Sequence, residues 1–173
     1  MAIVPKGTLN PHGGPVLRHL TLGNTITVTR YDALEASSGF AVLGTSANGL
    51  LGHVVDIETN NGTGLLTTGA AGAAIGSFTN TYATASTNQT VELVKAVTDI
   101  SKQTLYSAEV DATIGTTTGS NLLGYFMDLV DEDTLAENSA VTTTAQYHNW
   151  GLAPESTARA YVNLHESLIF GPF

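Results

Sequence analysis

The alternation of apolar and polar positions is clearest between residues 105 and 130. Residues 106–113 alternate strictly, which is the period of a strand with one buried face. Residues 122–130 are almost continuously apolar, as in a strand covered on both faces. Residues 115–121 are Gly, Thr, Ser and Asn, which favour a turn. The pattern therefore predicts a β-hairpin with a polar loop at its tip, and we expect this hairpin to be scaffold.

Short strands separated by turns are predicted along most of the remaining chain. The predicted strands are residues 24–36, 40–43, 50–57, 90–98, 141–150 and 159–170, with turns at 37–39, 47–49 and 151–156 and one helical turn within 131–140. Strands of this length with turns every eight to twelve residues are typical of sandwiches and barrels. We therefore expect an all-β protein, with a single-domain β-barrel or β-sandwich formed by residues 25–173.

Residues 1–24 are predicted to form an extended N-terminal arm. Pro5, Pro11 and Pro15 lie among several glycines, a composition that disfavours a helix or a central strand. A merely solvated tail would carry fewer apolar side chains than this segment does. The candidate assembly contacts are Ile3, Val4, Leu9, Val16, Leu17, Leu20 and Leu22. The arm is expected either to lie across a neighbouring subunit or to wrap its own barrel, and the sequence leaves both alternatives open.

Residues 59–89 are rich in Gly, Ala and Thr and are predicted to form a long loop. Three glycines make a helix within residues 69–76 unfavourable. A structureless segment of this length in a compact domain is usually functional or partly disordered on its own.

Composition supports the β assignment and limits the partners. The chain has 26 Thr and 18 Gly, and only 12% of its residues are charged; helical surfaces normally carry many more charged side chains. The net charge is −9, and the six basic residues are scattered, so neither nucleic acid nor an anionic membrane surface is an expected partner. The start of the chain has no apolar segment of the kind found in secretory signals. Without cysteine, we expect synthesis in a reducing cytoplasm and stability from packing or assembly.

No catalytic, cofactor or metal motif is found. The five histidines lack the spacing of metal ligands, and the loop at residues 115–120 lacks the lysine of a phosphate-binding loop. The carboxylates within residues 128–137 are candidate Ca²⁺ ligands or the candidate acids of a hydrolase, but their spacing does not match an EF-hand. Tyr147 and Trp150 could form a sugar-stacking platform or be core and rim residues. We expect no enzymatic activity, no cofactor and no metal.

Two segments of the chain resemble a known group of proteins. The residues that carry the resemblance are YSAEVDATIGTTTGSNLLGYFMDLVDEDTLAENSA, residues 106–140, and the closing VNLHESLIF, residues 162–170. They are similar to head decoration, or cement, proteins of tailed bacteriophages, and the similarity covers about residues 90–170.

The resemblance implies a β-rich homotrimer without enzymatic activity on the exterior of the virion. Such a protein would bind the major capsid protein and stabilise the head by bridging capsid subunits. The alternative is a phage tail, fibre or adhesin module that binds a receptor or a sugar.

Overall fold

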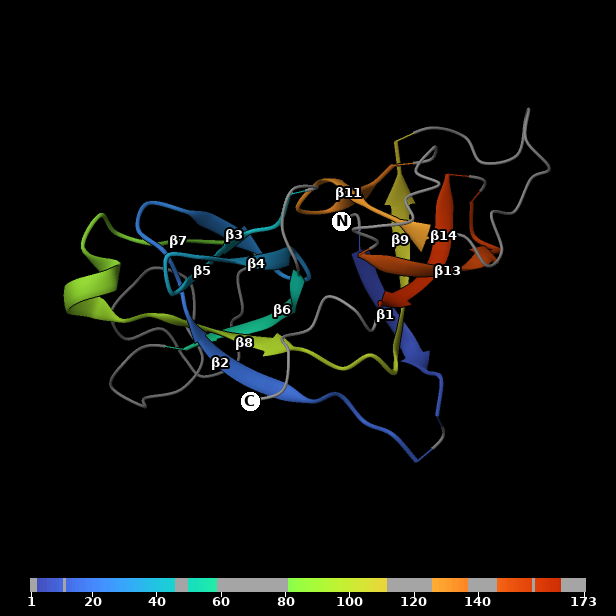
Figure 1. The fold of residues 1–173 in the computed structure, drawn as a ribbon, viewed down its shortest axis with the longest axis horizontal. Helices are drawn as coiled ribbons and strands as arrows, with labels where there is room; N and C mark the ends of the chain where they lie inside the picture. Colours follow the sequence, from blue (N-terminus) through green and yellow to red (C-terminus); the bar gives the residue numbers. More distant parts are fainter. Residues whose placement is uncertain are drawn as a thin grey trace.

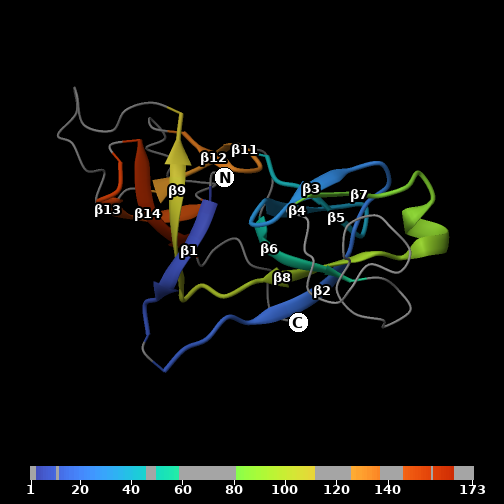
Figure 2. The same ribbon diagram turned by 180° about the vertical axis from the view of Figure 1, so that it is seen from behind.

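The structure is a computed structural model that describes residues 3–10, 12–45, 50–58, 81–111, 126–136, 146–156 and 158–165. Within these residues the protein is almost entirely β, with one short π-helical turn, η1 (Asn88–Glu92). Figures 1 and 2 show two β lobes side by side, each with its own sheet. The all-β prediction is confirmed, and one of the sheets is nearly closed into a barrel.

The first lobe is a five-stranded antiparallel sheet that nearly closes on itself. Its strands, in sheet order, are β2 (Leu17–Thr21), β8 (Lys95–Asp99), β6 (Leu50–Glu58), β4 (Ala33–Ser37) and β5 (Phe40–Leu43). Leu22 continues from β2 and forms a bridge with Ala41 of β5, which joins the two edges of the sheet. A two-stranded ribbon of β3 (Thr27–Thr29) and β7 (Thr81–Ala83) lies beside it.

The second lobe is a seven-stranded sheet. Its main path is β10 (Phe126–Met127), β13 (Tyr147–Leu152), β14 (Arg159–Leu164), β9 (Thr104–Val110), β12 (Thr134–Leu135) and β11 (Leu129–Asp131), and β1 (Ile3–Thr8) also pairs with β9. Because β14 occupies one edge of β9, β1 and β12 must follow one another along the other edge.

Each lobe has its own hydrophobic core. The core of the first lobe is aliphatic and consists of Leu22, Val28, Leu34, Ala41, Leu51, Val54, Ile57, Val94 and Ala96. The core of the second lobe includes aromatic residues and consists of Ile3, Ala33, Leu50, Tyr106, Ala108, Val110, Met127, Leu129, Leu135, Tyr147, Ala160, Val162 and Leu164. Ala33 and Leu50 belong to strands of the first sheet, so the second core continues across the junction between the lobes.

The N-terminal segment connects the two lobes as one edge of a long antiparallel ribbon. β1 pairs with β9, from Ile3 opposite Ala108 to Thr8 opposite Thr104, and β2 then pairs along the whole of β8. Between these strands, the Leu9 amide donates a hydrogen bond to the Gln103 carbonyl oxygen at 2.7 Å, which extends the pairing beyond β1. Pro5 is tolerated because β1 pairs only with β9 in the part of the chain that the structure describes.

Turn chemistry and alternation account for several local elements. The predicted turn at residues 37–39 lies in the β4–β5 hairpin, where Ser38 and Gly39 both have positive φ, 51° and 85°. A two-residue connection of this kind matches the twist of the strands that it joins. The predicted strand 40–43 coincides with β5, and strand 50–57 lies within β6.

The predicted hairpin of residues 105–130 is wrong. β9 has β1, β14 and β12 as neighbours, and β13 and β14 lie between β9 and β10. The predicted loop at residues 115–121 lies outside the described residues. Periodicity identified β9 correctly, but it carries no information about which distant strand pairs with it.

Two further boundaries differ from the predictions. The predicted strand 90–98 begins only at Lys95, because η1 ends at Glu92 and Leu93 has a positive φ of 52°. The helical turn within 131–140 is wrong for residues 131–136, which form the end of β11, a turn and β12. Of the predicted loop 59–89, residues 59–80 lie outside the described residues, and β7 lies in the remainder.

Candidate functional site

The candidate assembly residues of the N-terminal segment differ widely in exposure. Ile3 and Leu22 are buried in the two cores of their own chain, with exposed fractions of 1% and 0%. Val4 and Leu20 are half-buried. Leu9, Val16 and Leu17 are exposed at 39%, 49% and 45%. The structure thus places Leu9, Val16 and Leu17, but not Ile3 or Leu22, where another molecule can contact them.

Exposed large hydrophobic side chains concentrate on this segment. Six are found among the described residues, namely Leu9, Val16, Leu17, Val130, Trp150 and Leu152. A cavity of about 290 Å³ adjoins the ribbon. Its lining includes Pro5, Pro15 and Leu17 of the N-terminal segment and Tyr31 and Val55 of the first lobe. The segment therefore combines protruding apolar side chains with an apolar recess.

A buried hydrogen-bonded cluster joins the lobes at His53 of β6. The Nδ1 atom of His53 lies 3.0 Å from the carbonyl oxygen of Tyr31, and its Nε2 atom lies 3.0 Å from the hydroxyl of Tyr147. Because a carbonyl oxygen only accepts, Nδ1 carries the proton and Nε2 accepts from the Tyr147 hydroxyl. The His53 ring also packs on Tyr106, with a centroid distance of 4.3 Å. Burial lowers the pKa of His53 to about 4, against smaller opposing effects of the Tyr31 hydrogen bond and the Asp99 charge.

Asp99 extends this cluster at the end of β8. One of its carboxylate oxygens accepts hydrogen bonds from the Thr104 hydroxyl at 2.7 Å and from the Tyr106 hydroxyl at 2.8 Å, and the other accepts from the Ser101 amide at 2.8 Å. Burial and the adjacent Asp99 charge raise the pKa of Tyr106. Both oxygens of this buried carboxylate accept hydrogen bonds, so Asp99 stabilises the fold by fixing the donor groups around it.

The acidic turn after β11 packs against the first lobe. The Ala33 amide donates to the carbonyl oxygen of Glu132 at 2.7 Å. The pKa of the neighbouring Asp32 is raised to about 7, mainly by burial. A hydrogen bond from the Thr29 amide opposes this shift, and the charges of Glu132, Asp133 and Asp131 add smaller increases to it. Among the described residues no group of three or more acidic or histidine side chains is arranged to hold a metal ion. Glu137, which was also weighed as a ligand, lies outside those residues.

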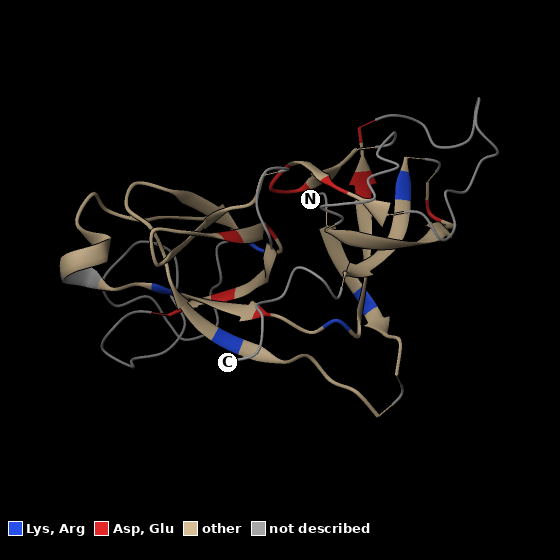
Figure 3. Ribbon diagram, in the orientation of Figure 1, with Lys and Arg blue, Asp and Glu red and all other residues tan. Residues whose placement is uncertain are grey.

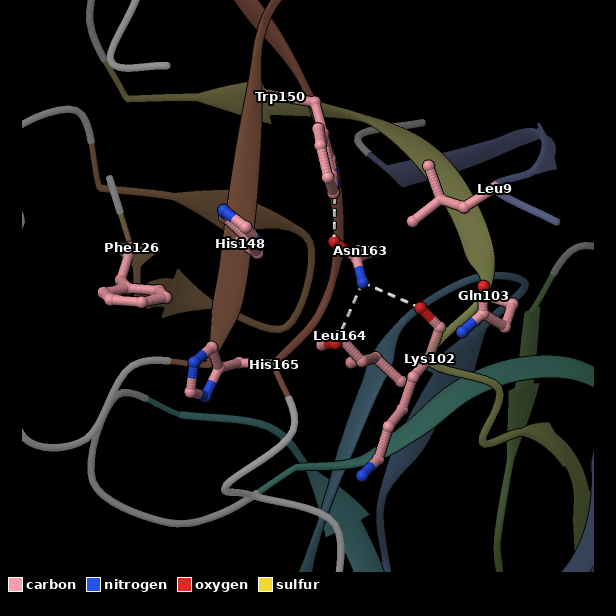
Figure 4. A pocket seen from close by; sticks show the side chains of 9 residues that line it. All are labelled: Leu9, Lys102, Gln103, Phe126, His148, Trp150, Asn163, Leu164 and His165. Carbon is pink, nitrogen blue, oxygen red and sulfur yellow. Dashed lines mark hydrogen bonds between the residues drawn. The ribbon is translucent and has the colours of Figure 1, made fainter. Parts of the chain in front are cut away.

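A second aromatic and histidine cluster lies on the outer face of the second sheet. It lines a groove of about 620 Å³ formed by Leu9, Lys102, Gln103, Phe126, His148, Trp150, Asn163, Leu164 and His165. The His148 and Trp150 rings are 4.7 Å apart between centroids, and Phe126 packs edge-on against His165 at 4.5 Å. Figure 4 shows Phe126, His148 and His165 on one side of Trp150, and Leu9 and Gln103 on the other.

Trp150 is held in place by a β-bulge and by Asn163. Asn149 pairs with Val162 and Gly151 with Tyr161, so Trp150 is the extra residue of the bulge. Its indole Nε1 donates to the Asn163 side-chain oxygen at 2.7 Å, and the Asn163 amide nitrogen in turn donates to the Lys102 carbonyl oxygen at 2.7 Å. The Trp150 side chain is nevertheless 44% exposed.

The paired platform of Tyr147 and Trp150 is not formed. Tyr147 is fully buried and points into the second core, whereas Trp150 lies on the rim of the groove. The alternative of core and rim residues is therefore correct. The groove instead uses His148, two positions before Trp150, which strand alternation could have identified. Phe126 and His165 could not be added from the sequence, because they reach the groove through long-range pairing of β10, β13 and β14.

Charged residues are dispersed over the molecule. Figure 3 shows basic residues on both lobes, separated from one another, with acidic residues between them. No helix among the described residues is long and apolar enough to span a membrane.

Comparison with protein-family models, with curated proteins and with solved structures finds no match for this chain.

Proposed function

We propose that this protein is a non-enzymatic structural protein of a bacteriophage virion that binds the outer surface of the capsid and stabilises the head by bridging capsid subunits. The observation that carries the proposal is the N-terminal segment, where Leu9, Val16 and Leu17 are exposed on a backbone that is paired to the rest of the chain. The similarity of residues 106–140 and 162–170 to head decoration proteins supports the same conclusion.

The pairing of this segment changes the energetics of docking. Burying one large apolar side chain contributes about 1.5–3 kcal/mol. A free arm would lose most of that contribution, because fixing its backbone costs about 1–2 kcal/mol per residue. Here Ile100 and Gln103 already hold the segment through backbone hydrogen bonds to Val16 and Leu9. Contact with a partner therefore requires little further ordering of the backbone.

The same reasoning supports self-association. Exposed apolar side chains on a protein with few charged residues are stabilised when a symmetric partner covers them. We propose a homotrimer, in which the N-terminal segments or the cavity beside them contact neighbouring copies. Light scattering at micromolar concentration measures the mass, and a monomer would contradict this part of the proposal.

The decisive experiment replaces the exposed residues and leaves the buried ones unchanged. A triple variant, L9S/V16S/L17S, is expected to remain folded and to lose most of its occupancy on capsids. The double variant V130S/L152S is the matched control, because it removes exposed apolar side chains elsewhere. Co-sedimentation with capsids measures occupancy, and heating the particles measures protection. Binding of the triple variant at the level of the unmodified protein would contradict the proposal.

A further inference from the structure

We propose that the groove on the outer face of β13 and β14 is a saccharide-binding site in which a pyranose ring stacks on Trp150. This site shares Leu9 with the capsid contact proposed above, but the inference rests on the geometry of the groove alone. Three properties of the groove support it: the fixed orientation of Trp150, the polar groups beside it and the absence of acidic side chains among the described residues that line it.

The orientation of Trp150 is set before any ligand arrives. The bulge places the residue on the outer face, and the Gly151 amide secures the bulge by donating a hydrogen bond to Asn149 Oδ1 at 2.7 Å. Asn163 fixes the rotation of the indole through its Nε1 atom. A large apolar ring that is both held rigidly and 44% exposed is prepared for stacking, because binding freezes few additional rotamers. A pyranose presents a face of C–H groups to such a ring and a rim of hydroxyls to its surroundings.

Polar groups are placed to meet those hydroxyls. The Gln103 side chain is exposed at the groove and offers one acceptor and two donors. The ring nitrogens of His148 make no hydrogen bond within the part of the chain that the structure describes, and the ring already packs beside Trp150. The ring centroids of Phe126 and His148 are 5.6 Å apart, so the aromatic surface of the groove extends beyond Trp150 and His148 to Phe126. The groove volume of about 620 Å³ is in the usual range for small-molecule sites.

The charged residues that line the groove limit the kind of ligand it can bind. The chain has 15 acidic and six basic residues, yet among the described residues the lining of the groove includes one lysine and two histidines and no carboxylate. A cationic ligand would find no charged partner among these residues, whereas a neutral or acidic sugar meets no repulsion from them. The class is therefore a short neutral or acidic oligosaccharide.

Trp150 is the only tryptophan in the chain, so its fluorescence reports on this site alone. We would titrate the full-length protein with chitotriose, maltotriose and trigalacturonate up to millimolar concentrations. At least one of them is expected to change the emission intensity or wavelength in a saturable way. A titration without any saturable change for the whole panel would overturn the assignment.

Calorimetry with the sugar that binds then separates stacking from general surface effects. Trp150→Ala is expected to weaken binding about tenfold or more, the effect of losing one well-packed contact. Trp150→Phe keeps an aromatic face and should lie between Trp150→Ala and the unmodified protein. Leu152→Ala is the matched control, because Leu152 is exposed on the same strand at 37% and does not line the groove. Thermal melting of each variant shows that it is folded.

Two results would contradict the inference even if a fluorescence change is seen. Equal affinity of Trp150→Ala and the unmodified protein would place the sugar elsewhere. A fluorescence change with capsids but with none of the sugars would mean that the groove belongs to a protein interface.

Discussion

Two aromatic and histidine clusters lie on opposite faces of the same strand, β13, and they differ in almost every other respect. The inner cluster contains His53, Tyr106 and Tyr147, and all three side chains are at most 1% exposed. The outer cluster is built around His148 and Trp150 and borders an open groove. Tyr147 and His148 are neighbours in the chain, so the alternation of a strand alone assigns them to different environments.

The difference shows how burial determines what a polar aromatic group does. In the inner cluster both nitrogens of His53 and the hydroxyls of Tyr106 and Tyr147 have hydrogen-bond partners, because an unpaired polar atom there would cost stability. In the outer cluster the indole of Trp150 is fixed by a hydrogen bond, whereas the ring nitrogens of His148, which lines the groove, have no hydrogen-bond partner among the described residues. The inner cluster therefore links the two lobes through buried hydrogen bonds, whereas the outer cluster lines the groove that we propose as a saccharide site.

The largest effect on stability is expected from a substitution at Gly52, which lies against the backbone of Asp99. A Cβ atom at Gly52 would lie 2.2 Å from the Asp99 carbonyl oxygen, and Gly52 has a φ of +146°. Gly52→Ala should therefore lower the free energy of unfolding by about 3 kcal/mol or more, or prevent folding. Chemical denaturation measures the change. Gly7→Ala is the control, since its Cβ would meet nothing within 4 Å, and an equal loss in both variants would contradict the explanation.

The second prediction concerns the stability of the protein at acidic pH, to which His53 and Asp32 contribute in opposite directions. His53 has a pKa of about 4 in the folded protein against 6.5 in the unfolded chain. Below pH 6.5 the unfolded chain binds a proton that folded His53 does not, so its contribution to stability falls by about 3 kcal/mol as the pH decreases to 4. Asp32, with its raised pKa of about 7, acts in the opposite direction, because the folded state holds the proton and loses stability as the pH rises from 4 to 7.

The two contributions oppose each other between pH 4 and pH 6.5. Asp32→Asn removes the pH-dependent contribution of Asp32 and keeps a side-chain oxygen that can accept a hydrogen bond from the Thr29 amide. Its stability should therefore rise more steeply with pH in this window than that of the unmodified protein. Denaturation at several pH values tests this, and NMR titration should find the His53 pKa near 4. Parallel stability curves for the two proteins would show that Asp32 does not hold its proton.

The third prediction removes a single oxygen from the inner cluster. Tyr147→Phe leaves the Nε2 atom of His53 buried without a donor, which should cost about 1–3 kcal/mol of unfolding free energy. Denaturation at pH 7 measures the loss. A cost of a few tenths of a kcal/mol would mean that the Tyr147 hydroxyl contributes little to the junction.

The smallest effect on stability is expected at His148, the residue after Tyr147 in β13. His148→Ala removes a whole ring from the outer face, but the ring is half-buried and lacks hydrogen bonds within the described structure, so the cost should stay below about 1 kcal/mol. Tyr147→Phe serves as the comparison for this variant, because the two variants alter adjacent positions of β13. A larger loss for His148→Ala than for Tyr147→Phe would reverse the assignment of structural and binding roles.

The elements that the sequence predicted well are those whose cause is local. Strand β5 is bounded by a turn in which Ser38 and Gly39 supply the positive φ values, and β14 shows its buried face in the alternation of Ala160 and Val162. The different burial of the neighbours Tyr147 and His148 also follows from alternation. The low charge and the abundance of Thr determined the all-β class.

Only the tertiary structure decided how these elements meet. Ile3 and Leu9 have the same apolar character in the sequence, but pairing with β9 buries the first and leaves the second exposed. His53 contacts Tyr147 across 94 positions of the chain, and Phe126 reaches the groove because β10 pairs with β13 rather than β9. The physical reason is that alternation is a property of neighbouring residues, whereas strand partners are selected by long-range packing and the cost of closing each loop.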